Sequence, residues 1–125
     1  MNEKGLKNFQ EPVGKVELPS KIFHTSREQS SEKSKMLVSN SRVVLGRVIL
    51  EPGDAHPANS HNDEEEYYYI VGGSGMIQLG ESEYSIEAGD VVQIPAGTCH
   101  GIRNSGKNPI EYLYFGVLLN DKTSC

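Results

Sequence analysis

The sequence lacks several features that mark common protein classes. No apolar run approaches the roughly 20 residues that a membrane-spanning helix needs. The opening stretch "MNEKGLKNFQ" has no apolar segment of the secretory kind. The two cysteines, Cys99 and Cys125, are far apart, which argues against a disulfide framework and favours a reducing compartment. We therefore expect a cytoplasmic protein without a membrane partner.

An excess of basic residues is also missing. Twelve lysines and arginines stand against 17 acids, so the formal net charge is −5 at pH 7. Nucleic-acid surfaces need clustered Lys and Arg to neutralise phosphates, so we expect no nucleic-acid partner. The 125 residues allow one domain with a single modest core.

The first 40 residues differ in texture from the rest. They are polar and serine-rich with weak periodicity, so we expect an N-terminal arm over 1–40 that either lies across a barrel or a neighbouring subunit or is partly disordered. His24, within this arm, is expected to play no part in a site. The remaining chain divides into a barrel over 41–120 and a short tail over 121–125.

From Arg42 onward the sequence reads as short strands separated by turns. "RVVLGRVIL" is rich in β-branched residues and stops at "EPGD", and later runs such as "EYYYIV", "MIQL" and "VVQI" also end at Gly, Pro, Asn or Asp. "GESE" reads as the tip of a hairpin. About seven strands with no convincing helix predict an antiparallel sandwich or barrel.

The stretch "GDVVQIPAGTCHGIRN" resembles one of the two signature motifs of the cupin family of small jelly-roll barrels. The match is complete, because Gly89, Pro95, Gly97, His100 and Asn104 all stand at the family's spacing. Several residue types at set distances make chance agreement improbable. The likeness implies an all-β fold, an antiparallel jelly-roll β-barrel.

The stretch "PGDAHPANSHNDEEEYYYIVGGSG" resembles the other cupin motif. It leads from Gly53 through "NSH" to Glu66 and on to Gly73. The family has His-x-His at the place of "NSH", and Asn59 stands where the first of these histidines would be. The resemblance to both motifs covers about residues 42–119 and leaves the arm unexplained.

The resemblance implies a metal site formed by His61, Glu66 and His100, with Asn59 at the place of a fourth ligand. Positions 59 and 61 are two apart, so their side chains share a face on a strand. Glu66 follows His61 at odd spacing, so a loop or bulge within "NDEE" has to reset the alternation.

Two ligand positions have alternatives. Glu65 fits a shorter spacing, although Glu66 agrees better with the family's apolar and glycine-rich tail. His56, next to a proline in a loop, can take the place of Asn59, or it is a surface histidine. Asp63 and Glu64 are then expected to be solvated loop charges.

Further side chains are candidates for the pocket. Tyr68 shares a strand face with Glu66, whereas Arg47 and Gln78 are polar residues within apolar strands. An inward position of these two is costly unless a ligand satisfies them, and an outward position is equally open. Cys99 is expected to point away from the metal and to be a small packed thiol.

Two histidines and one carboxylate with open positions form the donor set of non-haem Fe(II) oxygenases, and such a site also accepts Mn(II), Ni(II) or Zn(II). We therefore expect one divalent transition metal and a small-molecule ligand. The preferred function is a dioxygenase acting on a small oxygenated metabolite. The alternatives are a sugar isomerase or lyase, and a barrel that binds a small molecule without turnover. Cupins of this size are commonly dimeric, and open sheet edges favour pairing, so a homodimer is expected.

Overall fold

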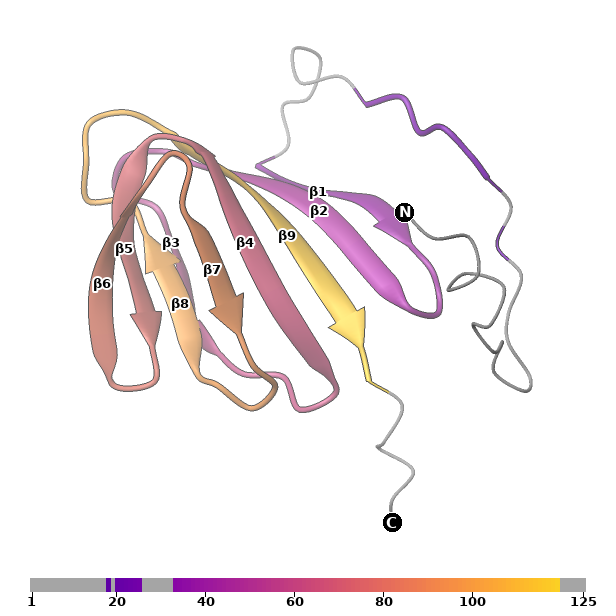
Figure 1. The fold of residues 1–125 in the computed structure, drawn as a ribbon. Coiled ribbons are helices and arrows are strands. Elements are labelled where there is room, and N and C mark those ends of the chain that lie inside the picture. Colours follow the sequence, from indigo (N-terminus) through magenta and orange to yellow (C-terminus); the bar gives the residue numbers. More distant parts are fainter. Residues whose placement is uncertain (1–17, 19, 26–32, 120–125) are drawn as a thin grey trace, which may run out of the picture.

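The computed structural model describes residues 18, 20–25 and 33–119, and every regular element within these ranges is a β-strand (Figure 1). No helix in this part of the chain is long and apolar enough to cross a membrane. The strands are β1 (Ser34–Ser39), β2 (Val43–Leu50), β3 (Ala55–Asn59), β4 (Glu64–Gly72), β5 (Ser74–Leu79), β6 (Ser82–Glu87), β7 (Val91–Ile94), β8 (His100–Arg103) and β9 (Ile110–Leu118).

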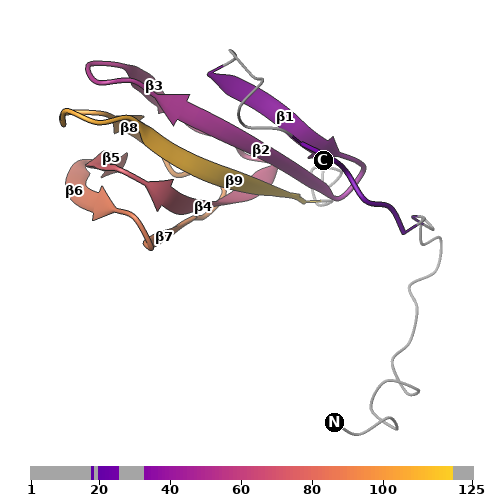
Figure 2. The ribbon, with the colours of Figure 1, turned by 90° about the horizontal axis from the view of Figure 1, so that it is seen from above.

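The strands form two antiparallel sheets. The larger has the order β1-β2-β9-β4-β7 and the smaller the order β3-β8-β5-β6. Figure 2 shows the sheets from above, with β1 and β6 at opposite ends of the molecule. Because the chain passes repeatedly from one sheet to the other, the topology is the antiparallel jelly roll that the sequence predicted.

The core lies between the two sheets. Along β4 the side chains alternate, so that Glu66, Tyr68 and Ile70 are buried while Tyr67 and Tyr69 are more exposed. The same alternation on the other strands supplies a β-branched and aromatic interior. The core residues are Val48, Leu50, Tyr68, Ile70, Ile77, Ile86, Val92, Ile94, Ile102, Ile110 and Tyr112.

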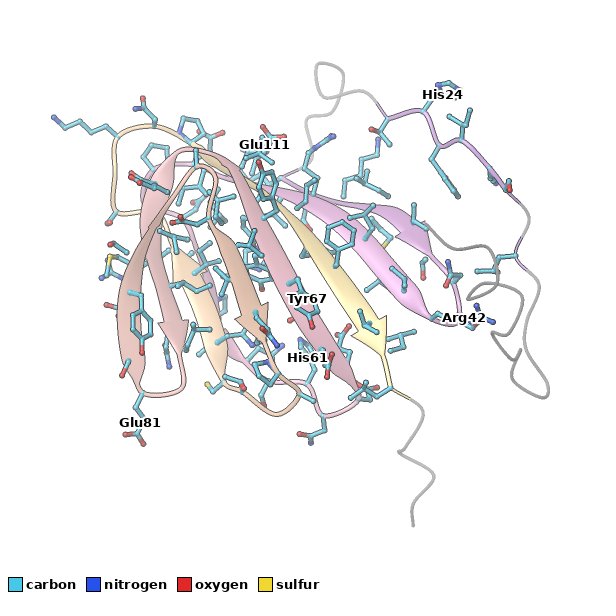
Figure 3. All side chains as sticks on the ribbon, viewed as in Figure 1. His24, Arg42, His61, Tyr67, Glu81 and Glu111 are labelled. Carbon is cyan, nitrogen blue, oxygen red and sulfur yellow. The ribbon has the colours of Figure 1, made fainter. Side chains whose placement is uncertain are left out.

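Two strands were not expected from the sequence. Strand β3, "AHPAN", lies at a sheet edge, where the missing N–H of Pro57 is tolerated, and its five residues are all exposed. Strand β1 falls inside the predicted arm and pairs with β2, with a bulge between Met36 and Val38. The predicted hairpin tip joins β5 to β6, and Figure 3 shows Glu81 at that tip. Residues 1–17, 19 and 26–32 of the arm and the tail over 121–125 lie outside the described residues.

Asn104, the last residue of the motif over 89–104, anchors the loop between β8 and β9. Its buried side chain donates from Nδ2 to the carbonyl oxygens of Leu50 (2.9 Å) and Asn108 (2.8 Å) and accepts at Oδ1 from Gly106 N (2.9 Å). Its main-chain oxygen accepts from Gly53 N at 3.0 Å. The residue thus ties the two motifs together at the end of the barrel remote from the histidines.

Candidate metal centre

Three predicted ligands meet at one end of the barrel. His61 lies in the loop between β3 and β4, where Figure 3 labels it. Glu66 lies on β4, and His100 is at the start of β8. One nitrogen or oxygen atom of each side chain lies within 4.8 Å of the others, and this is the one such cluster among the described residues. Glu66 Oε1 is 2.8 Å from His100 Nε2 and 4.0 Å from His61 Nε2.

The loop over residues 60–63 explains how His61 and Glu66 face the same point. It separates β3 from β4, so the odd spacing of the two residues does not place them on opposite faces. The turn before β8 is joined to this loop, because Gly97 N donates to His61 O at 2.7 Å. Gly97 has φ +84°, a conformation that glycine adopts without a Cβ penalty. The expected reset of the alternation is therefore present, and the loop that carries His61 is joined to the turn before His100 by one hydrogen bond.

The hydrogen bonds of His100 and Glu66 suit a shared cation. His100 Nδ1 is 2.9 Å from the carbonyl oxygen of Thr98, which can only accept, so the proton belongs on Nδ1 and Nε2 presents its lone pair to Glu66. Glu66 Oε1 is fully buried and has no hydrogen-bond partner. The 2.8 Å contact thus has the length of an ion pair without the direction of a hydrogen bond. Two lone pairs that converge in a buried position fit a metal ion.

His61, Glu66 and His100 line a cavity of about 540 Å³, a size typical of small-molecule sites. Its walls include Tyr68, Tyr112 and Tyr114 together with aliphatic side chains from β2. Tyr68 stacks on Tyr112 with ring centroids 4.7 Å apart, and burial raises the pKa of both phenols above the ordinary value. The tyrosines therefore stay neutral, able to donate and accept hydrogen bonds.

The expectation that Glu64 is a solvated loop charge is wrong. Strand β4 begins at Glu64, so alternation places this residue on the same face as Glu66 and inside the cavity. Its side chain is only 15% exposed, with Oε2 at 3.8 Å from His61 Nδ1. Burial, followed by the negative charge of Glu66, raises the pKa of Glu64 above its ordinary value. The sequence predicted a strand that begins at Glu66. The strand begins two residues earlier, and this places Glu64 in the cavity.

The alternative ligands take different places. Glu65 lies on the other face of β4, where its Oε1 is 3.5 Å from the Tyr67 hydroxyl. His56 lines the cavity but is outside the cluster of three. Asn59 also lines the cavity, pairs with His100 in the sheet register, and accepts a hydrogen bond at Oδ1 from Ser60 N at 2.8 Å. Glu66 is thus the acid brought to the histidines, and Asn59 and His56 lie nearby.

Of the three remaining pocket candidates, one lines the cavity and two do not. Tyr68 lines the cavity, with its ring centroid 6.1 Å from that of His100. Arg47 is 5% exposed but lies on the opposite face of β2 from the core residue Val48, outside the cavity. Gln78 also lies outside it and donates to Gly80 O at 2.9 Å.

Cys99 and His24 both lie outside the cluster. Cys99 is exposed and free, so the expected packed thiol is wrong, although it lies outside the cavity as expected. Figure 3 shows His24 far from His61, and His24 is exposed.

Comparisons with known proteins agree with the motifs. A family model described as "Cupin domain" matches residues 46–116. An oxalate-binding protein of Thermotoga maritima is 34% identical over 86 residues, which cover 69% of this chain and 71% of that protein.

Solved structures give the same fold. A predicted oxalate decarboxylase from Thermotoga maritima has a TM-score of 0.67 at 31% identity, covering 69% of this chain and 79% of its own. A cupin family protein with a double-stranded β-helix fold from Methanocaldococcus jannaschii has a TM-score of 0.73 at 17% identity, covering 87% and 100%. At 17% identity, the likeness to the Methanocaldococcus jannaschii protein concerns the fold alone.

Proposed function

The chain belongs to the cupin family, and we propose that it is a metal-dependent small-molecule cupin whose divalent transition metal is bound by His61, Glu66 and His100. The observation that carries this proposal is the buried, unpartnered Glu66 Oε1 facing the lone pair of His100 Nε2. The donor set of two imidazoles and one carboxylate suits Fe(II), Mn(II), Ni(II) or Zn(II).

The chain's own residues orient the ligands and shield the site. The Thr98 carbonyl holds the His100 ring with Nε2 directed inward. Tyr68 and Tyr112, stacked on each other, close the inner wall against water. Asn59 and His56 add polar groups beside the ligands. When bound, a divalent metal would act as a Lewis acid on an oxygen of the small molecule.

For the reaction, we propose dioxygenation of a small oxygenated metabolite. The support is the donor set, which is that of non-haem Fe(II) oxygenases, together with a cavity whose walls are largely apolar. The test is oxygen uptake by Fe(II)-loaded protein against a panel of oxygenated metabolites. Metal-dependent consumption of O₂ with one of them is expected, and a panel without any consumption would contradict dioxygenation.

A second candidate is binding without turnover. It is favoured by the name of the oxalate-binding relative, which states binding and no reaction. The name of the solved relative from Thermotoga maritima, a predicted oxalate decarboxylase, bears in the same way on lyase chemistry. A ligand that binds the metal-loaded protein, with neither O₂ uptake nor a new product by mass spectrometry, would establish this candidate.

The cellular compartment bears on the choice of metal. We propose a cytoplasmic location, because the exposed Cys99 is a free thiol, and thiols stay reduced there. Fe(II) is also kept reduced in such a compartment. Metal analysis of protein purified without added metal identifies the native ion.

Introducing a histidine at position 59 is expected to tighten metal binding. Asn59 pairs with His100 in the sheet and lines the cavity, so an imidazole there can add a fourth nitrogen. We expect Asn59→His to raise Zn(II) affinity by roughly tenfold and to lower any turnover, because a position needed by the ligand is filled. Chelator competition measures the affinity.

The matched control for this variant is Ser60→His. Residue 60 follows the strand and is not part of the cavity lining, so its imidazole should leave the affinity unchanged. A variant Asn59→His that binds metal more tightly and is also more active would show that Asn59 does not keep a coordination position open.

We also propose that the protein is a homodimer. The outer face of the large sheet exposes apolar side chains from neighbouring strands: Tyr69 (44%) and Val71 on β4, and Phe115 and Val117 on β9. Clustered apolar surface of this kind favours association. Light scattering at micromolar concentration should give twice the chain mass of 13.8 kDa. A monomer under these conditions would contradict the proposal.

A further inference from the structure

We propose that the cavity prefers an uncharged, hydroxylated chelating molecule to a dianion, and that Glu64 is the residue that sets this preference. The inference rests on the proposed metal function and names the class of ligand for that same site. It assigns a role in specificity to a residue that is neither one of the three proposed ligands nor a solvated charge.

The charge of the residues that line the cavity disfavours a dianion. Among the described residues that line it, Glu64 and Glu66 are acidic, and none is lysine or arginine. A divalent cation bound with neutral histidines therefore balances the two carboxylates without surplus. A dianion such as oxalate would add two negative charges in a partly desolvated space with no cationic side chain beside it. An uncharged molecule avoids this repulsion.

Glu64 is placed within the cavity, close to the three proposed ligands. Its carboxylate lines the cavity together with Glu66 and lies beside His61, with Oε2 at 3.8 Å from Nδ1, so a molecule that occupies the cavity comes within range of its charge. Gly116 on the neighbouring strand β9 leaves the room it needs, since a Cβ there would collide with Oε1 of Glu64 and with Val44. The main chain thus accommodates the carboxylate within the cavity.

The polar groups in the cavity walls favour a ligand that carries hydroxyl and carbonyl oxygens. The Glu64 carboxylate is an acceptor, so it recognises a hydroxyl that donates. Tyr68 and Tyr112 are neutral phenols, and Asn59 contributes an amide. These groups suit adjacent hydroxyl and carbonyl oxygens, as in a hydroxyketone or a vicinal diol. The name of the oxalate-binding relative concerns that protein, and the charges of this cavity point to a different ligand class.

The test compares wild type with Glu64→Gln and Glu65→Gln, each loaded with Mn(II) at pH 8. Calorimetry measures the binding of oxalate and of dihydroxyacetone. Glu64→Gln keeps the shape and removes the charge, so we expect it to bind oxalate about tenfold more tightly than wild type and dihydroxyacetone more weakly. Glu65→Gln removes the same charge from the outer face of β4 and should behave as wild type.

The outcomes separate this inference from the proposed function. Wild type that binds none of Mn(II), Fe(II), Ni(II) and Zn(II) overturns the metal function. Wild type that binds Mn(II), and binds oxalate as tightly as Glu64→Gln does, overturns the inference alone. An equal gain in Glu65→Gln also overturns it, because the effect would then be one of overall charge. A loss of Mn(II) from Glu64→Gln would assign Glu64 to metal binding instead. Glu64→Asp retains the charge and is expected to retain the discrimination against oxalate.

Discussion

Replacement of His100 by alanine is expected to abolish stoichiometric metal binding. His100 contributes the lone pair at 2.8 Å from the buried Glu66 oxygen, and the cluster contains only two other ligands. Loss of one ligand from a set of three should lower the affinity by at least about 100-fold, more than the loss of an outer hydrogen-bond partner to a ligand. Glu66→Gln should have a similar effect. Protein reloaded with Zn(II) and desalted is to be analysed for metal by mass spectrometry.

The matched control is Glu65→Gln, one residue along the same strand. Its side chain lies on the outer face, 3.5 Å from the Tyr67 hydroxyl, so its metal content should equal that of wild type. Thermal unfolding gives an independent readout, because a metal that binds the folded state raises the melting temperature of wild type and not of Glu66→Gln. Full metal content in His100→Ala would refute the assignment of the site.

Substitution of Gly73 by alanine is expected to destabilise the fold strongly. Gly73, the glycine that ends the motif over 53–73, has φ +84°, and a Cβ there would collide with the carbonyl oxygen of Pro109 and lie 2.9 Å from Ile110 Cα. The backbone conformation costs roughly 1–2 kcal/mol for a non-glycine residue, and the collision with main-chain atoms costs roughly 1–3 kcal/mol more. Urea unfolding should therefore show a loss of about 2–5 kcal/mol.

Gly53→Ala separates the two contributions. Gly53 has φ +88°, close to that of Gly73, but an added Cβ would meet nothing within 4 Å. Only the conformational cost of about 1–2 kcal/mol is then expected. Equal losses in the two variants would mean that the close approach of Gly73 to Pro109 and Ile110 has no energetic weight.

The sequence alone was enough to predict the fold and the identity of the clustered residues. Runs such as "VVQI" and "YLYFGV" form strands because β-branched and aromatic side chains pack on a pleated surface, and glycine and proline end them. The two motifs set His61, Glu66 and His100 at loop and strand positions whose parity can be worked out residue by residue. Glu66 was preferred to Glu65 because its spacing agrees with the family's apolar and glycine-rich tail, and the structure places the two on opposite faces of β4.

Tertiary structure decided what alternation within one strand cannot express. Strand β3 contains Pro57 and no β-branched residue, and it exists because β8 pairs with it. Glu64 entered the cavity because β4 begins earlier than its apolar pattern indicates and because Gly116, far away in the sequence, makes room for it. Arg47 lies outside the cavity. Alternation along β2 places Arg47 and Val48 on opposite faces, but it does not show which face becomes the interior. That choice is made when the second sheet packs on the first, through contacts between residues distant in the chain.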